Sequence, residues 1–207
     1  DFINESFGLA AGLTPELLGL GHAFEINPDI EDSFLYELSQ ALLLREVFPD
    51  SPLKYMPPTK HMSGDIFKGY LMNAMFNLAG IWSRQGIQLL GMLTEAMHTP
   101  FLQDRFLALE NASYIMNAAK HIHEQVDFRP DSLVVRRAGE VLEKTERLLE
   151  DVRRAGLLEA IASGWFADIR RPADRGKGLL GVREKSGRYF NPFKSVFARH
   201  LGLEKEI

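Results

Sequence analysis

Ionisable side chains recur at three points of the sequence, each time close to a short apolar run. They are His22 and Glu25, then Lys54 with Lys60 and His61, then Glu95 and His98. Imidazole, amine and carboxylate groups transfer protons between reactants or hold a charged substrate through opposite charges. In α/β enzymes such groups gather between the end of a strand and the start of the next helix. The sequence therefore predicts a site built where three successive strands end.

The stretch 51–64 shows this pattern most clearly. Residues 53–56 form a short extended run that begins after Pro52 and is halted by two further prolines, because the residue before a proline is pushed out of the helical region. Lys54 lies inside this run, and a lysine in a buried parallel strand must be paired or solvated by a cleft. A structural salt bridge and a site role both remain open for Lys54. Glu95, which follows the next apolar run, is either a helix cap or a site residue.

The apolar runs recur at a nearly constant interval. Residues 20–24, 53–56 and 87–93 begin 33 and 34 residues apart. Helices are predicted after them, over about 29–48, 65–85 and 100–125. A strand and a helix that repeat at this period predict a parallel sheet with right-handed crossovers, either doubly wound or part of a (β/α)8 barrel. A barrel would direct all three sets of ionisable residues into one mouth.

The repeating pattern ends near Pro130. Residues 131–155 have the pattern of a long helix with a charged outer face, and residues 157–162 that of a short helix. The remainder is rich in Gly, Arg and Lys and is predicted to be an irregular tail. We therefore divide the chain into residues 1–129, the βα units, and residues 130–207, the helices and tail that pack on them.

Composition narrows the classes of protein that fit. The 207 residues carry a net charge of −4 and no cysteine, which excludes disulfides and thiolate metal sites and argues against nucleic acid as a partner. No apolar run approaches the roughly 20 residues that span a bilayer, so we expect no membrane contact and a cytoplasmic location. Residues 1–11 have the apolar spacing of a helix already under way, without an initiator Met, so we expect the chain to be a fragment.

Four long segments resemble one known family. They are Gly-Leu-Gly-His-Ala-Phe-Glu at 19–25, Phe-Leu-Tyr-Glu-Leu-Ser-Gln at 34–40, Pro-Leu-Lys-Tyr-Met-Pro-Pro-Thr-Lys at 52–60 and Leu-Leu-Gly-Met-Leu-Thr-Glu-Ala at 89–96. The family is the α subunit of lysine 5,6-aminomutase, and the resemblance extends over nearly the whole chain. It implies the C-terminal part of a (β/α)8 TIM barrel, its last three βα units, followed by extra C-terminal helices and an irregular tail.

The resemblance also implies the chemistry and the partners. Members of the family are isomerases that move the terminal amino group of lysine, either D-lysine or β-lysine, to the adjacent carbon. Adenosylcobalamin initiates a radical mechanism in which pyridoxal 5′-phosphate (PLP) binds the migrating amine. The cobalt ligand and the lysine that anchors PLP belong to a smaller β subunit with a cobalamin-binding domain, in an α2β2 assembly. This chain is therefore expected to ligate no metal and to be inactive alone.

The family's substrate-binding lysine and glutamate fall on Lys54 and Glu95. An ammonium suits the α-carboxylate of a diamino acid, and a carboxylate suits its α-ammonium. The candidates for facing the cofactors, by position alone, are His22, Glu25, Tyr55, Thr59 and His98. Two alternatives remain open. One is the barrel of ornithine 4,5-aminomutase, and the other is a non-catalytic α/β interaction module whose strand-end charges form salt bridges.

Overall fold

The computed structural model describes residues 1–22, 26–57, 61, 62, 65–95, 97, 99–166, 199 and 200. The chain divides into two compact units, Asp1–Arg147 and Leu148–Ile207, and each is considered by itself. In the described part of the chain, no helix is both long enough and apolar enough to cross a bilayer.

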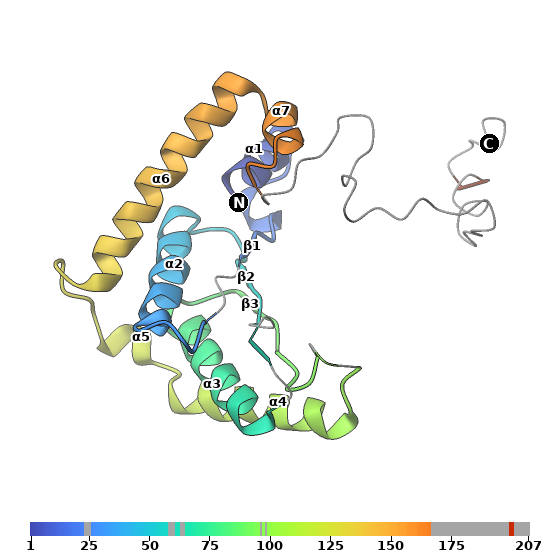
Figure 1. Ribbon diagram of the computed structural model, residues 1–207, viewed down its shortest axis with the longest axis vertical. Coiled ribbons are helices and arrows are strands. Elements are labelled where there is room, and N and C mark those ends of the chain that lie inside the picture. The colour runs from blue at the N-terminus through green and yellow to red at the C-terminus, as the bar shows by residue number, and fades with distance from the viewer. Residues whose placement is uncertain are drawn as a thin grey trace. The chain divides into compact units, whose positions relative to one another are not determined.

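Helices lie close to the ranges that the sequence predicts, and Figure 1 labels them in the fold. The first unit contains α1 (Phe2–Ala10), the 3-10 helix η1 (Pro15–Leu17), α2 (Ser33–Val47), α3 (Ile66–Trp82), α4 (Leu102–Ala118) and α5 (Ile122–Gln125). The helix α6 (Leu133–Ala155) begins in the first unit and ends in the second, which also contains α7 (Leu157–Ala162). The helix predicted over 100–125 is divided, because residues 119–121 form a turn between α4 and α5.

Helix boundaries agree with the local sequence signals. Asp65 caps α3, since its carboxylate accepts hydrogen bonds from the amides of Phe67 (3.0 Å) and Lys68 (3.1 Å). Gly12, with a φ of 87°, follows the end of α1 in a conformation that a side chain would disfavour. These signals are local, which explains why the sequence predicts them.

Three short strands form the parallel sheet that the sequence predicts. They are β1 (Gly21–His22), β2 (Lys54–Tyr55) and β3 (Ile87–Gln88), in this order. Lys54 pairs with Gly21 on one side and with Ile87 on the other, and both pairings are parallel. The described strands therefore form the arc of three βα units on which the predicted site depends.

The strands are shorter than the apolar runs predicted for them. After β3 the backbone leaves the ladder, and the carbonyl of Gly91 accepts a hydrogen bond from Asn73 Nδ2 of α3 over 2.7 Å. A Cβ at Gly91 would lie 2.6 Å from Asn73 Oδ1 and 2.9 Å from Pro57 Cβ, so glycine permits this close approach. The apolar residues that follow Gln88 therefore pack as a loop against α3 instead of extending the strand.

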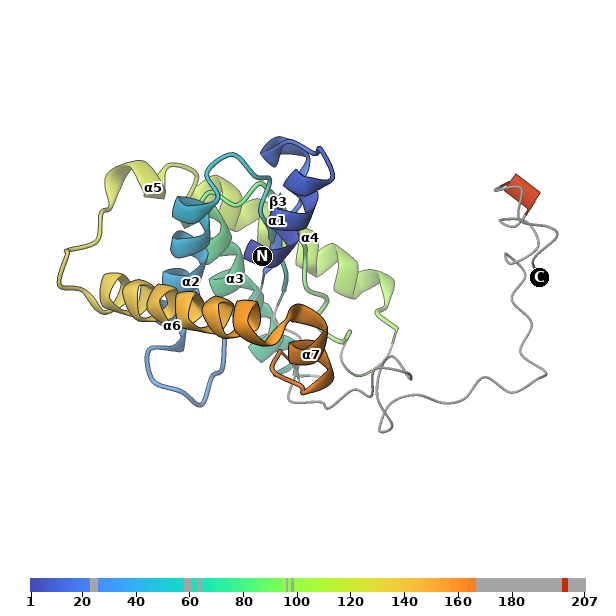
Figure 2. The ribbon, with the colours of Figure 1, turned by 90° about the horizontal axis from the view of Figure 1, so that it is seen from above.

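The helices α2 and α3 lie next to each other (Figure 2) and enclose the main hydrophobic core with β2. Its buried members are Ile26, Leu38, Ala41, Tyr55, Phe76 and Ala79. The rings of Tyr55 and Phe76 stack with their centroids 4.1 Å apart. Complete burial of each large apolar side chain contributes about 1.5–3 kcal/mol. One face of β2 is thus held by the helical layer.

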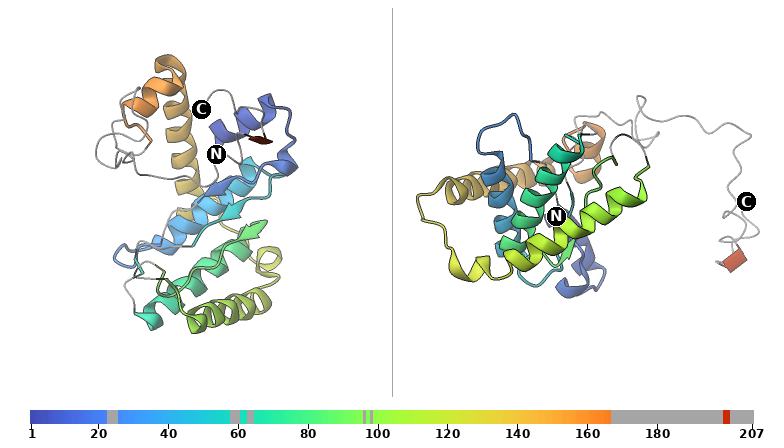
Figure 3. Two further views of the ribbon diagram at one scale, coloured as in Figure 1. Left: turned by 90° about the vertical axis from the view of Figure 1, so that its right-hand side faces the viewer. Right: turned by 90° about the horizontal axis from the view of Figure 1, so that it is seen from below.

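A buried layer of amide side chains joins α3, α4 and β3. Asn77 lies at its centre, because its Nδ2 donates to Asn111 Oδ1 (2.9 Å) and its Oδ1 accepts from Gln88 Nε2 (3.2 Å). Asn111 Nδ2 in turn donates to the carbonyl of Tyr70 over 2.9 Å. Buried amides that satisfy one another resist displacement. This layer fixes α4, which lies beside α3 (Figure 3), relative to the strand.

The start of α6 packs against the βα units. Ser39 Oγ of α2 donates to the carbonyl of Val134 over 2.7 Å, and both residues are buried. The division between the two compact units falls inside α6, after Arg147. The domain boundary predicted from the sequence, between residues 129 and 130, stays a prediction. In the second unit Val152 and Ala160 are buried. The predicted irregular tail falls almost entirely on residues 167–198 and 201–207, which lie outside the described residues.

Candidate functional site

The strand β2 points two successive side chains to opposite faces of the sheet. Tyr55 enters the core under α2 and α3, so Lys54 must project from the other face. Its aliphatic stem passes over β1, where a Cβ at Gly21 would lie 3.9 Å from Lys54 Cδ. The side chain of Lys54 is half-buried. The ammonium is therefore carried on the sheet face opposite the main hydrophobic core.

The ammonium of Lys54 forms no ion pair with any residue that the structure describes. A half-buried lysine can bury its aliphatic stem while its ammonium stays hydrated, so the ammonium of Lys54 is free to bind a ligand. The structural salt bridge that the sequence left open for Lys54 thus has no support among these residues. An anionic ligand would supply the missing charge.

The carboxyl group of Glu95 lies in the turn that follows β3. The turn is closed by hydrogen bonds from Glu95 N to Met92 O (3.3 Å) and from Met97 N to Thr94 O (2.9 Å). Burial raises the pKa of the Glu95 carboxyl above its ordinary value, while the backbone of Met92 acts in the opposite direction. Glu95 Oε1 is buried and has no hydrogen-bond partner in the part of the chain described.

Glu95 does not cap α4. That helix begins at Leu102, and the carboxylate in its first turn belongs to Asp104. Asp104 Oδ2 accepts from the amide of Phe101 over 2.9 Å and from Thr94 Oγ1 over 2.6 Å. Sequence reasoning missed Asp104, although an acid in the first turn of a helix is a recognisable signal. The helix-cap interpretation of Glu95 is therefore wrong for α4, and its site role stays a prediction.

Tyr55 lies on the core side of β2, away from the face that carries Lys54. Its hydroxyl donates to the carboxylate of Glu37 on α2, a residue that is 1% exposed. Burial, the Glu37 charge and this hydrogen bond together raise the pKa of Tyr55 well above its usual value. The cofactor-facing role predicted for Tyr55 disagrees with this position, and we give it a structural role. Glu37 was missed, although it lies between Phe34 and Leu38 on an apolar helix face.

The structure describes the side chains of none of the other residues predicted to face the cofactors. His22 belongs to β1 and pairs with Tyr55 in the ladder, but only its backbone is described. Glu25, Thr59 and His98 lie outside the described residues. In the rest of the chain, no three His, Asp or Glu side chains are grouped in a way that could hold a metal ion.

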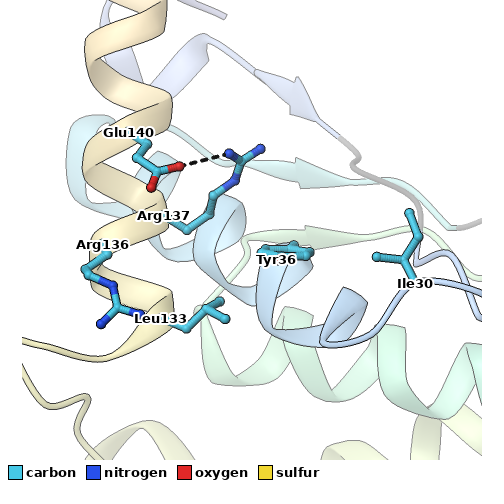
Figure 4. Close-up of a pocket in the computed structure, with 6 residues that line it drawn as sticks. All are labelled: Ile30, Tyr36, Leu133, Arg136, Arg137 and Glu140. Atoms are coloured by element: carbon cyan, nitrogen blue, oxygen red, sulfur yellow. Dashed lines mark hydrogen bonds and ion pairs between the residues drawn. The ribbon is translucent and has the colours of Figure 1, made fainter.

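A cavity of about 490 Å³ lies between α2 and the start of α6 (Figure 4). Its arginines already have partners. Arg137 binds Glu140 over 3.1 Å and lies over the ring of Tyr36, with 5.6 Å from its Cζ to the ring centroid. Arg136 donates to the carbonyl of Asp131 over 2.7 Å. None of the predicted site residues lines this cavity, so we keep Lys54 and Glu95 as the candidate site.

Comparison with known proteins gives one consistent result. Residues 1–196 match the family model described as the D-lysine 5,6-aminomutase TIM-barrel domain of the alpha subunit. The chain is 55% identical over 192 residues to the lysine 5,6-aminomutase alpha subunit of Acetoanaerobium sticklandii, which covers 93% of this chain and 37% of the relative. It is 53% identical, with the same coverage, to the protein of that name from Fusobacterium nucleatum. The chain thus spans just over a third of the length of these relatives.

Proposed function

The chain belongs to the family of lysine 5,6-aminomutase α subunits, and we propose that the protein of which it is part moves the terminal amino group of lysine to the adjacent carbon. In this proposal the described strands are the last three of a TIM barrel. The reaction is an isomerisation, because the nitrogen changes position within one molecule. The residues described here hold the end of the substrate that does not react.

The observation that carries the proposal is that two groups of opposite charge, Lys54 and Glu95, have no ionic partner among the described residues. Lys54 on β2 forms no ion pair with the described residues, and Glu95 beyond the neighbouring β3 has a buried oxygen without a hydrogen bond in that part of the chain. The α-carbon of lysine carries a carboxylate and an ammonium side by side. The α-carboxylate would bind Lys54 and the α-ammonium would bind Glu95. Each charge would then meet its opposite in a partly desolvated site.

Holding the α-carbon in this way positions the rest of the substrate. The four methylene groups of lysine separate the held end from the terminal amine, so the amine extends away from β2 and β3. Fixing the far end reduces the freedom of the reacting end, and that lowers the entropic part of the barrier. Glu95 must be ionised to bind an ammonium, and the incoming positive charge favours its ionised form.

Adenosylcobalamin and PLP, which the family implies, supply the radical and the group that binds the migrating amine. Among the described residues, no three His, Asp or Glu side chains are grouped to hold a metal ion. We propose that both are anchored by a β subunit with a cobalamin-binding domain in an α2β2 assembly. The proposed neighbours of the cofactors are His22, Glu25, Thr59 and His98, because in the sequence they lie at or shortly after the ends of the predicted strands.

The two alternatives are weaker. Both relatives are lysine 5,6-aminomutase α subunits, which favours lysine over ornithine as the substrate. A non-catalytic interaction module would use its strand-end charges in salt bridges, whereas Lys54 forms none with the described residues. We retain the cytoplasmic location and the inactivity of residues 1–207 alone as parts of the proposal.

Steady-state kinetics of the complete α and β subunits would test the proposal. Lys54→Ala and Glu95→Ala should each cost about 2 to 5 kcal/mol of transition-state stabilisation, or roughly 30- to 5,000-fold in kcat/KM. Cofactor binding should be unchanged. The matched controls are Lys68→Ala and Glu110→Ala, whose side chains are exposed on α3 and α4. Near-normal kcat/KM in both site variants would refute the assignment.

A further inference from the structure

One carboxylate fastens both ends of the loop that carries Glu95. The loop runs from Thr94 to Phe101, and Asp104 Oδ2 accepts from Thr94 Oγ1 at its start (2.6 Å) and from Phe101 N at its end (2.9 Å). Asp104 is 4% exposed and Thr94 is 8% exposed. Hydrogen bonds to a buried carboxylate are stronger than bonds between neutral groups in water. The two ends of the loop are thus held at a single point.

Asp104, which holds both ends of the loop, is itself fixed to the rest of the first unit. Asp104 belongs to the first turn of α4, and α4 is joined to α3 through the hydrogen bond between Asn111 and Asn77. Asn77 also accepts from Gln88 on β3. The loop is therefore connected to β3, the strand that precedes it, through a series of buried and partly buried hydrogen bonds.

The carboxylate of Glu95 depends on such a connection because no described residue forms a hydrogen bond to its buried Oε1. The position of the carboxylate therefore depends on the backbone that carries it. Thr94 is the residue immediately before Glu95, and its carbonyl accepts from Met97 N over 2.9 Å. We infer that Thr94 and Asp104 are positioning residues that aim Glu95 at the α-ammonium of the substrate. This inference rests on the proposed function of Glu95.

The alternative is that Asp104 merely caps α4. The two roles use different bonds, because the bond from Phe101 N caps the helix and the bond from Thr94 Oγ1 fixes the loop. Thr94→Val keeps the shape of the side chain and removes only the loop bond. Thr94→Ser keeps the hydroxyl and should restore the wild-type behaviour. The comparison of Thr94→Val with Thr94→Ser therefore separates positioning from capping.

The test is a double-mutant cycle in the complete α and β subunits loaded with both cofactors. Thr94→Val should lower kcat/KM for lysine about tenfold, mainly through KM, as expected for a lost hydrogen bond to a charged group. Thr94→Ser should stay within about twofold of wild type. In a Glu95→Gln background, Thr94→Val should have almost no further effect, because the group that it aims has already been changed.

Two kinetic results would overturn the inference. One is a normal KM in Thr94→Val when Glu95→Gln is impaired, and the other is an equal loss from Thr94→Val in both backgrounds. If Glu95→Gln itself is normal, the proposed function fails and the inference fails with it. If Thr94→Val does not assemble, Asp104→Asn replaces it, since its neutral acceptor should weaken the loop bond and give a smaller rise in KM. An unchanged KM in Asp104→Asn would then contradict the inference.

Discussion

The two faces of β2 differ in the partners that the structure shows for their polar side chains. On the core face, the hydroxyl of Tyr55 binds the carboxylate of Glu37, and its ring stacks on Phe76. On the other face, the ammonium of Lys54 forms no ion pair with the described residues. Beyond β3, the carboxyl of Glu95 keeps a buried oxygen without a hydrogen bond in the described part of the chain. The polar contacts of the core face therefore stabilise the fold. We attribute the charges of Lys54 and Glu95 to ligand binding.

This contrast separates stability from function at neighbouring positions. A carboxylate such as Glu37 is compatible with burial when a hydroxyl donates to it. A carboxylate such as Glu95, raised in pKa by burial, lowers stability and is retained where an incoming cation makes it useful. Substitutions on the core face should therefore destabilise the fold. Substitutions at Lys54 and Glu95 should change substrate binding and leave the fold intact.

The largest effect on the core face should come from Phe76→Ala. Phe76 is 1% exposed and stacks on Tyr55, so its removal leaves a cavity between α3 and β2. We expect the free energy of unfolding of the full-length subunit to fall by about 3–5 kcal/mol. Phe67 of the same helix is 79% exposed, and Phe67→Ala should cost only about 0.5 kcal/mol. Denaturant titration of both variants measures the difference, and equal losses would contradict this placement of α3.

A smaller loss should follow Tyr55→Phe. The variant keeps the ring and removes the hydroxyl that donates to Glu37, so the free energy of unfolding should fall by about 1.5–3 kcal/mol. Because the pKa of Tyr55 is raised well above its usual value, the hydroxyl stays protonated and the loss should be the same between pH 6 and 9. KM for lysine should change little. A large rise in KM with normal stability would instead return Tyr55 to the site.

The smallest effect should be a gain in stability from Glu95→Gln. Burial raises the pKa of Glu95 in the folded state, so above its unfolded pKa the folded protein binds more protons than the unfolded one. The contribution of Glu95 to stability therefore decreases as the pH rises through this window. Glu95→Gln removes the free-energy cost of ionising a buried carboxyl group. The melting temperature of this variant should equal or exceed that of the wild type at pH 8, with a smaller difference at pH 5. A lower melting temperature at pH 8 would show that Glu95 stabilises the fold.

The sequence predicts those parts of the fold that depend on local signals. Regularly spaced apolar runs predict three parallel strands, and Asp65 and Gly12 mark helix boundaries. Strand length is not predicted, because it depends on whether Gly91 binds a neighbouring strand or Asn73 of α3. That choice is made by tertiary packing, which no window of the sequence contains.

The same limit applies to the candidate site. The resemblance and the places of Lys54 and Glu95 near strand ends predict their role in the site. The cofactor-facing role of Tyr55 stays a prediction that its place in the core does not favour. Period-two alternation predicts that Lys54 and Tyr55 face opposite sides of the sheet, but it does not predict which side the helices cover. The contact from Thr94 to Asp104 spans ten residues and joins a loop to a helix, so only the three-dimensional structure reveals it.

The most direct test of the central claim pairs a substitution with a change in the ligand. Cadaverine is lysine without the α-carboxylate, and it should not sense the loss of Lys54. In the complete α and β subunits, Lys54→Ala should weaken lysine binding about 30-fold or more while the Kd of cadaverine changes less than about twofold. If Lys54→Ala weakens lysine and cadaverine equally, or weakens neither, Lys54 does not bind the α-carboxylate and the account is contradicted.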